Sequence, residues 1–274
     1  AVVEAMVAHP AVRRVNFTGS TKVGRIIAMT CAKYLKPVVL ELGGKAPLVI
    51  LDDANIEDAV NGAAFGCFAN SGQICMSTER IIVDQKIADE FAKKFSDKAK
   101  NLPLGDPRKP EPVVLGSVIG MNTVEHCNAL IDDALSKGAK LLCGEKVNTT
   151  LMPATVLDHV TPAMRIYHEE TFGPVKCIVR VKGVEEAVAC ANDNEYGLSS
   201  AVFGGDIARA FNVARRIDSG ICHVNGPTVH DEAQMPFGGV KGSGIGRFGG
   251  KAGVAEFTEL RWITLQTTPR HYPF

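Results

Sequence analysis

The sequence predicts an α/β protein with a parallel sheet, and three features of the chain support this fold class. Short apolar runs rich in β-branched residues alternate with longer amphipathic segments along most of its length. Hydrophobic residues make up 46% and charged residues 22% of the 274 positions, which is typical of a globular protein with a sizeable core. The 27 glycines and 14 prolines indicate many turns, and they do not fit a fibrous or disordered composition.

The first residues predict half of a βαβ unit. Residues 1–12 look like the end of a helix and residues 13–17 like a short strand. Thr18-Gly19-Ser20-Thr21 is expected to be a turn that opens a helix reaching about Tyr34, with Ser20 or Thr21 as its N-cap. A strand this early has no preceding parallel partner in the sequence, so we expect the N-terminus to be a truncation point.

From residue 38 onwards, strands and helices are expected to alternate. Strands are expected over 38–42, 46–51, 80–83, near 140–143 and 154–157, and over 175–181, 199–203 and 220–225. Helices are expected over 56–69, 87–102, 122–137, 184–192 and 206–216. Residues 103–112, which are rich in proline, predict a surface loop. Val254 to Leu265 predicts a terminal strand whose apolar edge could pair with a second subunit.

Composition argues against several classes of function. Thirty basic and thirty acidic residues balance, so no basic field is expected to bind nucleic acid. No stretch reaches the roughly 18 apolar residues of a membrane helix and the N-terminus lacks a signal-peptide pattern, so we expect no membrane contact and a cytoplasmic protein. The eight cysteines include no Cys-x-x-Cys pair and there is no His-Glu-x-x-His, which argues against a zinc site and a disulfide framework. We therefore expect no metal ligands.

Cys75 differs from the other cysteines, most of which lie in apolar runs typical of buried thiols. It lies in the stretch Phe68-Ala69-Asn70-Ser71-Gly72-Gln73-Ile74-Cys75-Met76-Ser77, a small polar turn between a predicted helix and a predicted strand. Such a turn leaves the sulfur reachable, and its backbone N–H groups can stabilise a thiolate and an oxyanion. Because a free thiol is mostly protonated at neutral pH, a nucleophilic Cys75 needs a base. A small apolar filler is the alternative role.

Glu41 is a candidate base. It follows the apolar run Val38-Val39-Leu40 and precedes Gly43-Gly44, so it is expected at the C-terminal end of a strand, where open α/β sheets bind their ligands. A surface charge beside a turn would explain the same position. Pairing with a nucleophile would favour the catalytic interpretation.

Three further stretches have both a functional and a structural explanation. Thr18-Gly19-Ser20-Thr21 could bind a phosphate at a helix start, or could only cap the helix. Glu169-Glu170-Thr171-Phe172-Gly173-Pro174 places adjacent carboxylates before a turn, which also fits helix-terminal charge or a solvated loop. Gly244-Ile245-Gly246-Arg247-Phe248-Gly249 matches the dinucleotide fingerprint, but no clean strand precedes it, so we interpret it as a structural loop.

Five motifs in order resemble the NAD(P)-dependent aldehyde dehydrogenase superfamily. They are Phe17-Thr18-Gly19-Ser20-Thr21, Glu41-Leu42-Gly43-Gly44-Lys45, Gly72-Gln73-Ile74-Cys75, Glu170-Thr171-Phe172-Gly173-Pro174 and Pro236-Phe237-Gly238-Gly239. The stretch from Cys222 to Pro236 is similar to the salicylaldehyde and vanillin dehydrogenase branch, which oxidises aromatic aldehydes.

The resemblance implies a catalytic pair. Cys75 would attack the aldehyde to form a thiohemiacetal, and a hydride would pass to NAD or NADP. Glu41 would be the general base that helps to deprotonate the thiol and then activates water to hydrolyse the thioester. The product would be the carboxylic acid.

The resemblance also implies binding residues. Gly19 and Ser20 would bind the cofactor pyrophosphate, Glu170 the nicotinamide ribose, and Phe172 would lie beside the ring. Asn225 and the residues after it would line the path of the aldehyde. The terminal strand is similar to the family's oligomerisation element, which implies a homo-oligomer, either a dimer or a tetramer.

The resemblance implies an aldehyde dehydrogenase-like α/β fold in three parts. Residues 1–43 would be the C-terminal remnant of a Rossmann-type NAD(P)-binding domain, 44–243 the catalytic domain, and 244–274 a closing segment with the oligomerisation strand. The long N-terminal segment of the family, with its oxyanion asparagine and its ribose-binding lysine, is not in the sequence, so we expect an N-terminally truncated chain. The residues leave open which aldehyde is used, whether NAD or NADP is preferred and whether this chain is active.

Two other functions stay open. One is a non-catalytic module that oligomerises or binds partners through an apolar sheet edge. The other is an esterase remnant, in which Cys75 and Glu41 hydrolyse an activated ester without NAD. Loss of one oxyanion donor would weaken that activity about 10²- to 10³-fold.

Overall fold

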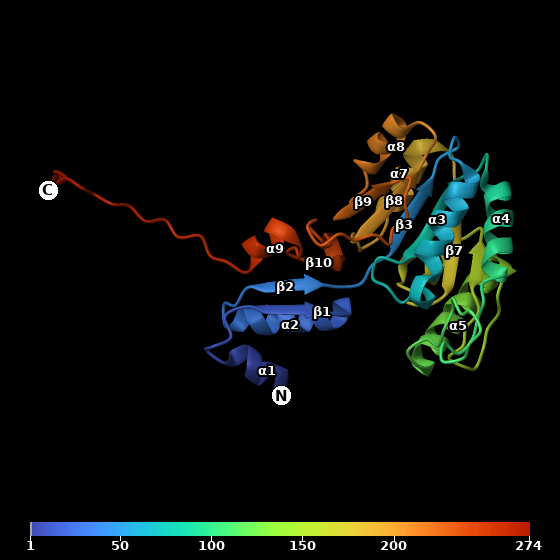
Figure 1. The fold of residues 1–274 in the computed structure, drawn as a ribbon, viewed down its shortest axis with the longest axis horizontal. Helices are drawn as coiled ribbons and strands as arrows, with labels where there is room; N and C mark the ends of the chain where they lie inside the picture. The colour runs from blue at the N-terminus through green and yellow to red at the C-terminus, as the bar shows by residue number, and fades with distance from the viewer. Residues whose placement is uncertain (1) are drawn as a thin grey trace.

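The computed structural model describes residues 2–274 and contains two sheets with helices packed around them (Figure 1). The helices are α1 (Val2–Ala8), α2 (Thr21–Lys33), α3 (Ile56–Phe68), α4 (Ala88–Lys100), α5 (Met121–Ser136), α6 (Arg165–His168), α7 (Gly183–Asn192), α8 (Ile207–Ala214) and α9 (Gly250–Glu256). The strands are β1 (Val15–Thr18), β2 (Val38–Glu41), β3 (Ala46–Ile50), β4 (Thr78–Asp84), β5 (Lys140–Cys143), β6 (Thr155–Asp158), β7 (Val175–Val181), β8 (Ser199–Phe203), β9 (Ile221–Val224) and β10 (Gly244–Ile245). Two 3₁₀ turns, η1 (Ala69–Gly72) and η2 (Lys241–Ser243), complete the set.

The larger sheet has seven strands in the order β5-β6-β7-β4-β3-β8-β9. All neighbours are parallel except β5, which pairs antiparallel with β6 at the edge. The predicted parallel sheet is therefore confirmed, with one antiparallel edge strand. The reason for the exception is local, because β5 and β6 are joined without the intervening helix that a parallel crossover needs.

Helices cover both faces of this sheet. Successive residues of a strand point to opposite faces, so Val49 and Leu51 of the β3 region pack with α5, α7 and α8, whereas Leu48 and Ile50 pack with α3 and α4. These are the two main hydrophobic cores. Because both faces of the central strands are buried in these cores, the strands are continuous apolar runs and do not alternate between apolar and polar residues.

The smaller sheet contains β1, β2 and β10. β1 and β2 are parallel, and helix α2 packs against them through Ile27 and Cys31. Gly244 and Ile245 pair antiparallel with Glu41 and Leu40. The glycine-rich stretch thus closes the sheet next to Glu41, and it does not follow a parallel strand as a dinucleotide-binding turn would. The interpretation of this stretch as a structural loop agrees with the structure.

A four-residue link, Leu42 to Lys45, joins the two sheets. β2 runs toward the larger sheet in Figure 1, so its carboxyl end faces the amino ends of β3, β4 and β8. Two hydrogen bonds with Ser243, the last residue of η2, hold the link in place. The Leu42 N–H donates to the Ser243 carbonyl at 2.9 Å, and the Ser243 hydroxyl donates to the Gly43 carbonyl at 2.7 Å. This junction is where the predicted site residues lie.

The terminal strand predicted over 254–265 is not formed. Helix α9 covers Gly250–Glu256, and the described residues 258–274 form neither helix nor strand but leave the body of the molecule (Figure 1). Trp262 is 90% exposed on this tail. A strand needs a neighbour for its backbone hydrogen bonds, and within this single chain the tail has none among the described residues. Its predicted role in oligomerisation stays a prediction.

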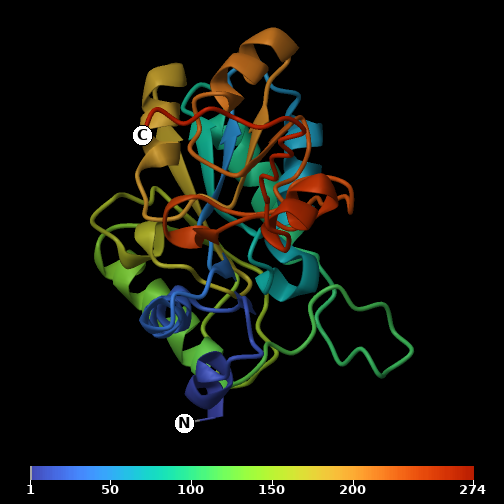
Figure 2. The same ribbon diagram turned by 90° about the vertical axis from the view of Figure 1, so that its left-hand side faces the viewer.

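The surface carries a projecting loop and a mixed charge pattern. The proline-rich segment between α4 and α5, predicted as a surface loop, extends away from the body (Figure 2).

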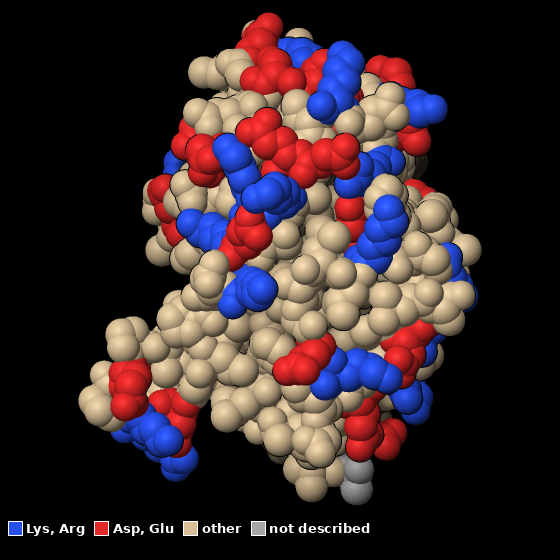
Figure 3. Space-filling view, turned by 90° about the vertical axis from the view of Figure 1, so that its right-hand side faces the viewer, with Lys and Arg blue, Asp and Glu red and all other residues tan. Residues whose placement is uncertain are grey.

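Basic and acidic side chains are interspersed on the face shown in Figure 3. Exposed ion pairs such as that of Lys94 with Glu57 are screened by solvent and contribute little, so the cores dominate the stability. Among residues 2–274, no helix combines the length and apolar character needed to cross a membrane.

Candidate active site

The turn before Cys75 has an unusual backbone. Helix α3 ends at Phe68, and Asn70, Ser71 and Gly72 then adopt positive φ angles of 51°, 56° and 73°. Left-handed conformations are costly for residues other than glycine, on the order of 1–3 kcal/mol each, so surrounding contacts must hold this turn. The Asn70 amide donates to the Gln73 carbonyl at 3.1 Å, and the Ser71 hydroxyl accepts from the Gly116 N–H at 3.1 Å.

Glycines bring two loops against this turn. A Cβ on Gly72 would lie 2.3 Å from the Gly173 carbonyl oxygen, and one on Gly44 would lie 2.5 Å from the Cys75 carbonyl oxygen. Neither position can therefore carry a side chain without displacing backbone. The turn, the sheet-to-sheet link and the Glu170 segment, each of which contains one of the five motifs, are packed together.

Cys75 is half-buried, three residues before strand β4. Burial raises the pKa of its thiol, and the negative charges of Glu41 and Glu170 raise it further. The backbone N–H groups of Met76 and of Cys75 itself act in the opposite direction and favour the thiolate. Both carboxylates thus lie near enough to influence the sulfur, although they come from distant parts of the sequence.

Glu41 ends strand β2 and is only 4% exposed. Neither of its carboxylate oxygens has a hydrogen-bond partner among the described residues. Burial raises its pKa to about 7, with a smaller opposing effect from the positive charge of Arg247. A Cβ on Gly238 would lie 2.7 Å from the Gly246 carbonyl oxygen and 2.9 Å from Oε1 of Glu41, so the backbone contact requires a glycine where the Pro236-Phe237-Gly238-Gly239 motif passes the carboxylate. A buried, unpaired carboxylate with a pKa near neutrality is suited to general-base chemistry.

Glu170 lies on the other side of the link. Its Oε1 accepts a hydrogen bond from the Gly44 N–H at 2.8 Å, and burial raises its pKa to about 7. A Cβ on Gly43 would lie 2.6 Å from Oε2, so both glycines of the link contact this carboxylate. Phe172 has a φ of 47° and is 40% exposed. Their cofactor-binding roles stay predictions.

Gly19 and Ser20 are exposed at the end of β1. The Ser20 hydroxyl accepts from the Val23 N–H at 3.4 Å, as expected of an N-cap, and the Gly19 N–H donates to the Glu41 carbonyl at 3.0 Å. Plain capping therefore explains Ser20 in this structure. The Gly19 bond places this turn beside the carboxyl end of β2, and binding of a pyrophosphate there stays a prediction.

The structure does not support Asn225 as a lining residue of the aldehyde path. Its side-chain amide exchanges two hydrogen bonds with the backbone of Gly204, at 2.9 and 3.0 Å. Asn225 follows the carboxyl end of β9, whereas Cys75 precedes the amino end of β4, and these strands run in the same direction in one sheet. The two residues therefore lie at opposite ends of the sheet.

A later residue of the same segment does reach the site. The Thr228 hydroxyl donates to the Met76 carbonyl at 2.7 Å and lies 2.8 Å from the Thr78 hydroxyl. Thr228 is fully buried. The chain thus returns from Asn225 to the Cys75 turn within three residues.

Sequence reasoning missed a buried charged cluster beneath the site, formed by Lys45, Glu79 and Lys176. Glu79 Oε2 lies 2.8 Å from Lys45 Nζ, and its Oε1 lies 2.7 Å from Lys176 Nζ. All three side chains are at most 3% exposed. The sequence feature that could have indicated the cluster is the presence of charged residues beside the apolar residues of predicted buried strands. Charged side chains are rarely buried unless they are paired.

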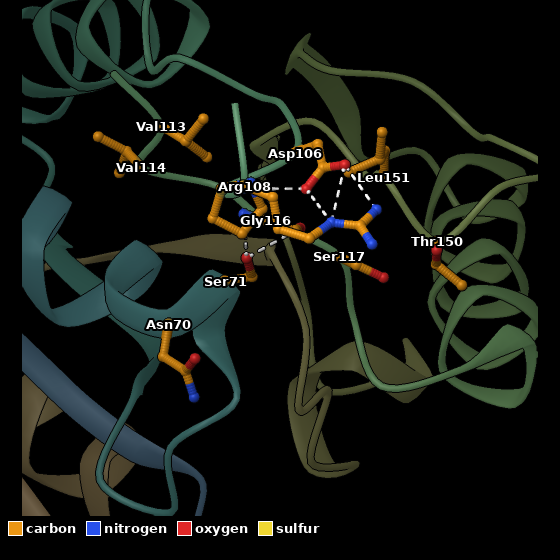
Figure 4. A pocket seen from close by; sticks show the side chains of 11 residues that line it. Asn70, Ser71, Asp106, Arg108, Val113, Val114, Gly116, Ser117, Thr150 and Leu151 are labelled. Atoms are coloured by element: carbon orange, nitrogen blue, oxygen red, sulfur yellow. Dashed lines mark hydrogen bonds and ion pairs between the residues drawn. The ribbon is translucent and has the colours of Figure 1, made fainter. Parts of the chain in front are cut away.

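Two cavities lie near the site. One, of about 610 Å³, is bounded by the η1 turn, the projecting loop and residues 150–151, with an Asp106–Arg108 ion pair on its wall (Figure 4). The predicted site residues do not line it. The other, of about 360 Å³, is lined by β9 and by residues 230–232 and 235–236. Gly220 on its wall packs directly on Gly238, the residue that contacts Glu41.

Comparison with known proteins agrees with this arrangement. A family model described as "Aldehyde dehydrogenase family" matches residues 1–263. The chain belongs to the aldehyde dehydrogenase family. It is 57% identical over 272 residues to a vanillin dehydrogenase of Pseudomonas fluorescens, with 99% of this chain and 56% of that protein covered.

Solved structures of the same family have the same fold. A salicylaldehyde dehydrogenase from Pseudomonas putida G7, complexed with salicylaldehyde, superposes with a TM-score of 0.98 at 52% identity and covers 100% of this chain and 56% of its own. An NADP-dependent glyceraldehyde-3-phosphate dehydrogenase from Bacillus halodurans C-125, complexed with NADP, gives a TM-score of 0.90 at 37% identity, with 95% of this chain and 54% of its own covered. The chain thus spans about half the length of the relatives that it matches.

The Cys75 turn should tolerate no side chain at Gly72. We expect Gly72→Ala to lower the free energy of unfolding by about 2–4 kcal/mol, because the new Cβ meets the Gly173 carbonyl and the backbone is left-handed. Gly226→Ala is the matched control, since its Cβ would meet only the Cβ of His223, at 3.8 Å. Urea unfolding measures both. Equal effects would contradict a tightly packed turn.

The raised pKa of Glu41 predicts a pH-dependent cost to folding. Between its ordinary value of 4.5 and its folded value of about 7, the folded chain holds a proton that the unfolded chain releases, so this group lowers stability as pH rises through that window. Glu41→Gln should therefore stabilise the chain by about 1–3 kcal/mol near pH 8 and have little effect near pH 4.

Glu169→Gln is the control for this prediction. Its hydrogen bond to Arg165 lowers the pKa of Glu169, so removing the carboxylate should slightly destabilise the chain near pH 8, which is the opposite sign. Urea unfolding at both pH values measures the two variants. A Glu41→Gln variant with the same stability change at both pH values would show that the carboxyl group titrates normally.

Proposed function

We propose that this chain carries the nucleophile and the general base of an enzyme that oxidises an aldehyde to its carboxylic acid. The observation that carries the proposal is the pairing, at the junction of two sheets, of a half-buried thiol with a buried carboxylate whose pKa is about 7. Membership of the aldehyde dehydrogenase family supports it. The activity of the whole protein, its substrate and its partners are part of this proposal.

The chemistry at Cys75 starts with a proton transfer. Burial and the negative charges of Glu41 and Glu170 raise the pKa of the thiol, so transfer of its proton to Glu41 removes one of the two charges that oppose the thiolate. The thiolate then attacks the carbonyl carbon of the aldehyde to form a thiohemiacetal. The backbone N–H groups of Met76 and Cys75 lie close enough to the sulfur to stabilise the oxyanion formed beside it.

A bound nicotinamide dinucleotide, NAD or NADP, would supply the acceptor for the hydride that leaves the thiohemiacetal carbon. Glu170 and Phe172 fit such a group in part. Glu170 accepts one hydrogen bond, from Gly44, and a carboxylate can accept more, for example from ribose hydroxyls. Phe172 is partly exposed, so its ring can contact a planar group. The relative from Bacillus halodurans, solved with NADP, supports this class of cofactor.

Glu41 acts a second time after oxidation. The proton that Glu41 took from Cys75 first passes to solvent, which restores the carboxylate. Glu41 then takes a proton from the water that attacks the acyl carbon of the thioester, and returns it to the departing Cys75 thiolate, so that the acid is released and the thiol is restored. No other described group neutralises the Glu41 carboxylate by a hydrogen bond, which keeps it free for this step.

Aromatic aldehydes are the proposed substrates. The support is the similarity to a vanillin dehydrogenase and to a salicylaldehyde dehydrogenase solved with salicylaldehyde. The cavity of about 360 Å³ beside Gly238 is the proposed approach, and its wall includes His230 and Met235 from the segment expected to line the path. The cytoplasmic location expected from the sequence stays a prediction.

The catalytic proposal is tested by comparing two cysteine variants. Cys75→Ala should abolish NADH formation from benzaldehyde, salicylaldehyde or vanillin, and also the hydrolysis of a nitrophenyl ester. Cys143→Ala, on the edge strand β5 at the opposite side of the sheet from β9 and the proposed approach, should retain the parent rate. Glu41→Gln should slow ester hydrolysis about 10²- to 10⁴-fold, because it removes a general base. Unchanged rates in Cys75→Ala would exclude Cys75 as the nucleophile.

Calorimetry with NAD and NADP separates the alternatives in the same preparation. Cofactor binding with NADH formation supports the dehydrogenase. Ester hydrolysis that depends on Cys75, without cofactor binding, indicates the esterase remnant. A folded chain with neither activity indicates a non-catalytic, partner-binding module.

A second part of the proposal concerns assembly. The tail beyond α9 exposes several large apolar side chains, namely Leu260, Trp262, Ile263 and Leu265. Strand β9 lies at an edge of the larger sheet, where a further strand can pair. We propose that the tail of one chain pairs with the sheet of another and forms a homodimer or homotetramer.

Removal of residues 258–274 should convert the oligomer to a monomer in analytical ultracentrifugation. Trp262→Asp should weaken association in the full chain, because it places a charge in an apolar contact. Arg270→Asp, which changes an exposed charged residue on the same tail, is the control and should leave the mass unchanged. A parent chain that is monomeric at all concentrations would contradict the assembly proposal.

A further inference from the structure

The buried cluster of Lys45, Glu79 and Lys176 is connected to both halves of the site. Lys176 Nζ donates to the Ser77 hydroxyl at 3.1 Å, and Ser77 is two residues from Cys75. Lys45 Nζ donates to the Thr171 hydroxyl at 3.3 Å, and Thr171 follows Glu170 directly. Glu79 Oε2 also accepts from the Thr171 backbone N–H at 2.9 Å. One carboxylate therefore links the Cys75 turn to the Glu170 segment.

The three charged residues come from three adjacent parts of the larger sheet. Lys45 immediately precedes β3, Glu79 lies in β4 and Lys176 lies in β7, and β4 pairs with both neighbours. Burial alone would raise the pKa of Glu79, but the charges and hydrogen bonds of Lys176 and Lys45 outweigh it and hold the pKa far below its usual value. Glu79 is thus held as a carboxylate at neutral pH.

Stability alone is a weak reason for such a cluster. Desolvating three charges is costly, and well-packed apolar residues of similar volume are often at least as stable as a buried ion network. The cluster also carries a net positive charge, since two lysines surround one carboxylate. What apolar side chains could not supply is its set of directed hydrogen bonds to Ser77 and Thr171.

We propose that Glu79, held by Lys45 and Lys176, is a positioning residue that fixes the Glu170 carboxylate relative to the Cys75 thiol. This inference rests on the proposed function of Cys75 and Glu170. The Glu79 side chain is only 3% exposed, so its proposed role is not one of direct contact with substrate or cofactor. It acts through Thr171 on one side and through Lys176 and Ser77 on the other.

The consequence is measurable as an electrostatic coupling. The charges that face the Cys75 thiol and raise its pKa are those of Glu41, from β2, and Glu170, from the segment before β7. If the cluster sets the position of Glu170, then the effect of Glu170 on the pKa of Cys75 should depend on the cluster. A cluster that only stabilises the fold would leave that effect unchanged.

The test is a double-mutant cycle on the full chain, with the rate of Cys75 alkylation by iodoacetamide followed against pH by peptide mass spectrometry. In the parent, Glu170→Gln should move the alkylation profile to lower pH, because one of the charges that raise the thiol pKa is removed. In the background of Lys45→Met, Glu79→Met and Lys176→Met together, the shift caused by Glu170→Gln should be less than about half as large.

Arg180→Met is the matched control. Arg180 lies on the same strand as Lys176 and pairs with Asp158 and Asp89, away from the Cys75 turn. It should lower stability and leave the Glu170→Gln shift at its parent size. Glu79→Gln serves as a second variant if the triple variant does not fold, and failure of both to fold would assign the cluster to folding alone and overturn the proposal.

The outcomes separate this inference from the proposed function. An undiminished Glu170→Gln shift in the triple variant would overturn the positioning role while Cys75 remains a reactive thiol. A Cys75 that no pH makes more reactive than Cys222 would instead contradict the proposed function itself.

Discussion

The short link between the two sheets is the constraint on which the site depends. Four residues separate Glu41, the last residue of β2, from Ala46, the first residue of β3. Four residues span at most about 14 Å, so the carboxyl end of β2 must lie close to the amino end of β3. Glu41 directly precedes this link, and Cys75 and Glu170 contact it. Its two glycines admit the Glu170 carboxylate and the Cys75 carbonyl where side chains would exclude them.

The site contains backbone conformations and buried charges that are unfavourable by themselves, and contacts with the surrounding residues offset their free-energy cost. Three consecutive left-handed residues precede Cys75, and two buried carboxylates with pKa values of about 7 lie near a thiol whose pKa is also raised. None of these features stabilises the fold at neutral pH. Contacts with neighbouring segments maintain them. Gly72 packs on Gly173, the Thr228 hydroxyl donates a hydrogen bond to the Met76 carbonyl after Cys75, and the buried cluster forms hydrogen bonds with the segments on both sides.

Much of the fold could be predicted from the sequence, because its signals are local. Apolar periodicity and glycine turns placed nearly every helix and strand of the larger sheet within a few residues. The terminal strand failed because strand formation depends on a neighbouring strand that periodicity does not report, and residues 250–256 formed a helix instead. The antiparallel edge strand β5 likewise depends on which strand lies beside it and not on its own residues.

The candidate site was predicted unevenly for a similar reason. Cys75, Glu41 and Glu170 lie in motifs whose order could be read from the sequence, and the structure brings all three together at the junction. Asn225 failed because its side chain bonds to Gly204, a contact 21 positions away that no motif indicates. The charged cluster was missed because its members are separated by up to 131 positions in the sequence. No single one of them indicates an ion pair until the fold brings the three side chains together.

The electrostatics of the thiol also indicate which step the site favours. A nucleophilic cysteine is often activated by a positive neighbour that holds it as a thiolate. Here the facing charges are negative, and the thiol pKa is raised. In the proposed mechanism the proton therefore stays on sulfur in the resting site, and a reactive thiolate forms only as Glu41 accepts that proton. In the proposed mechanism Glu41 is negative at the start of both steps, because it accepts the thiol proton in the first and a proton of water in the second. It must therefore release the first proton before hydrolysis, and a pKa near 7 allows that release at neutral pH.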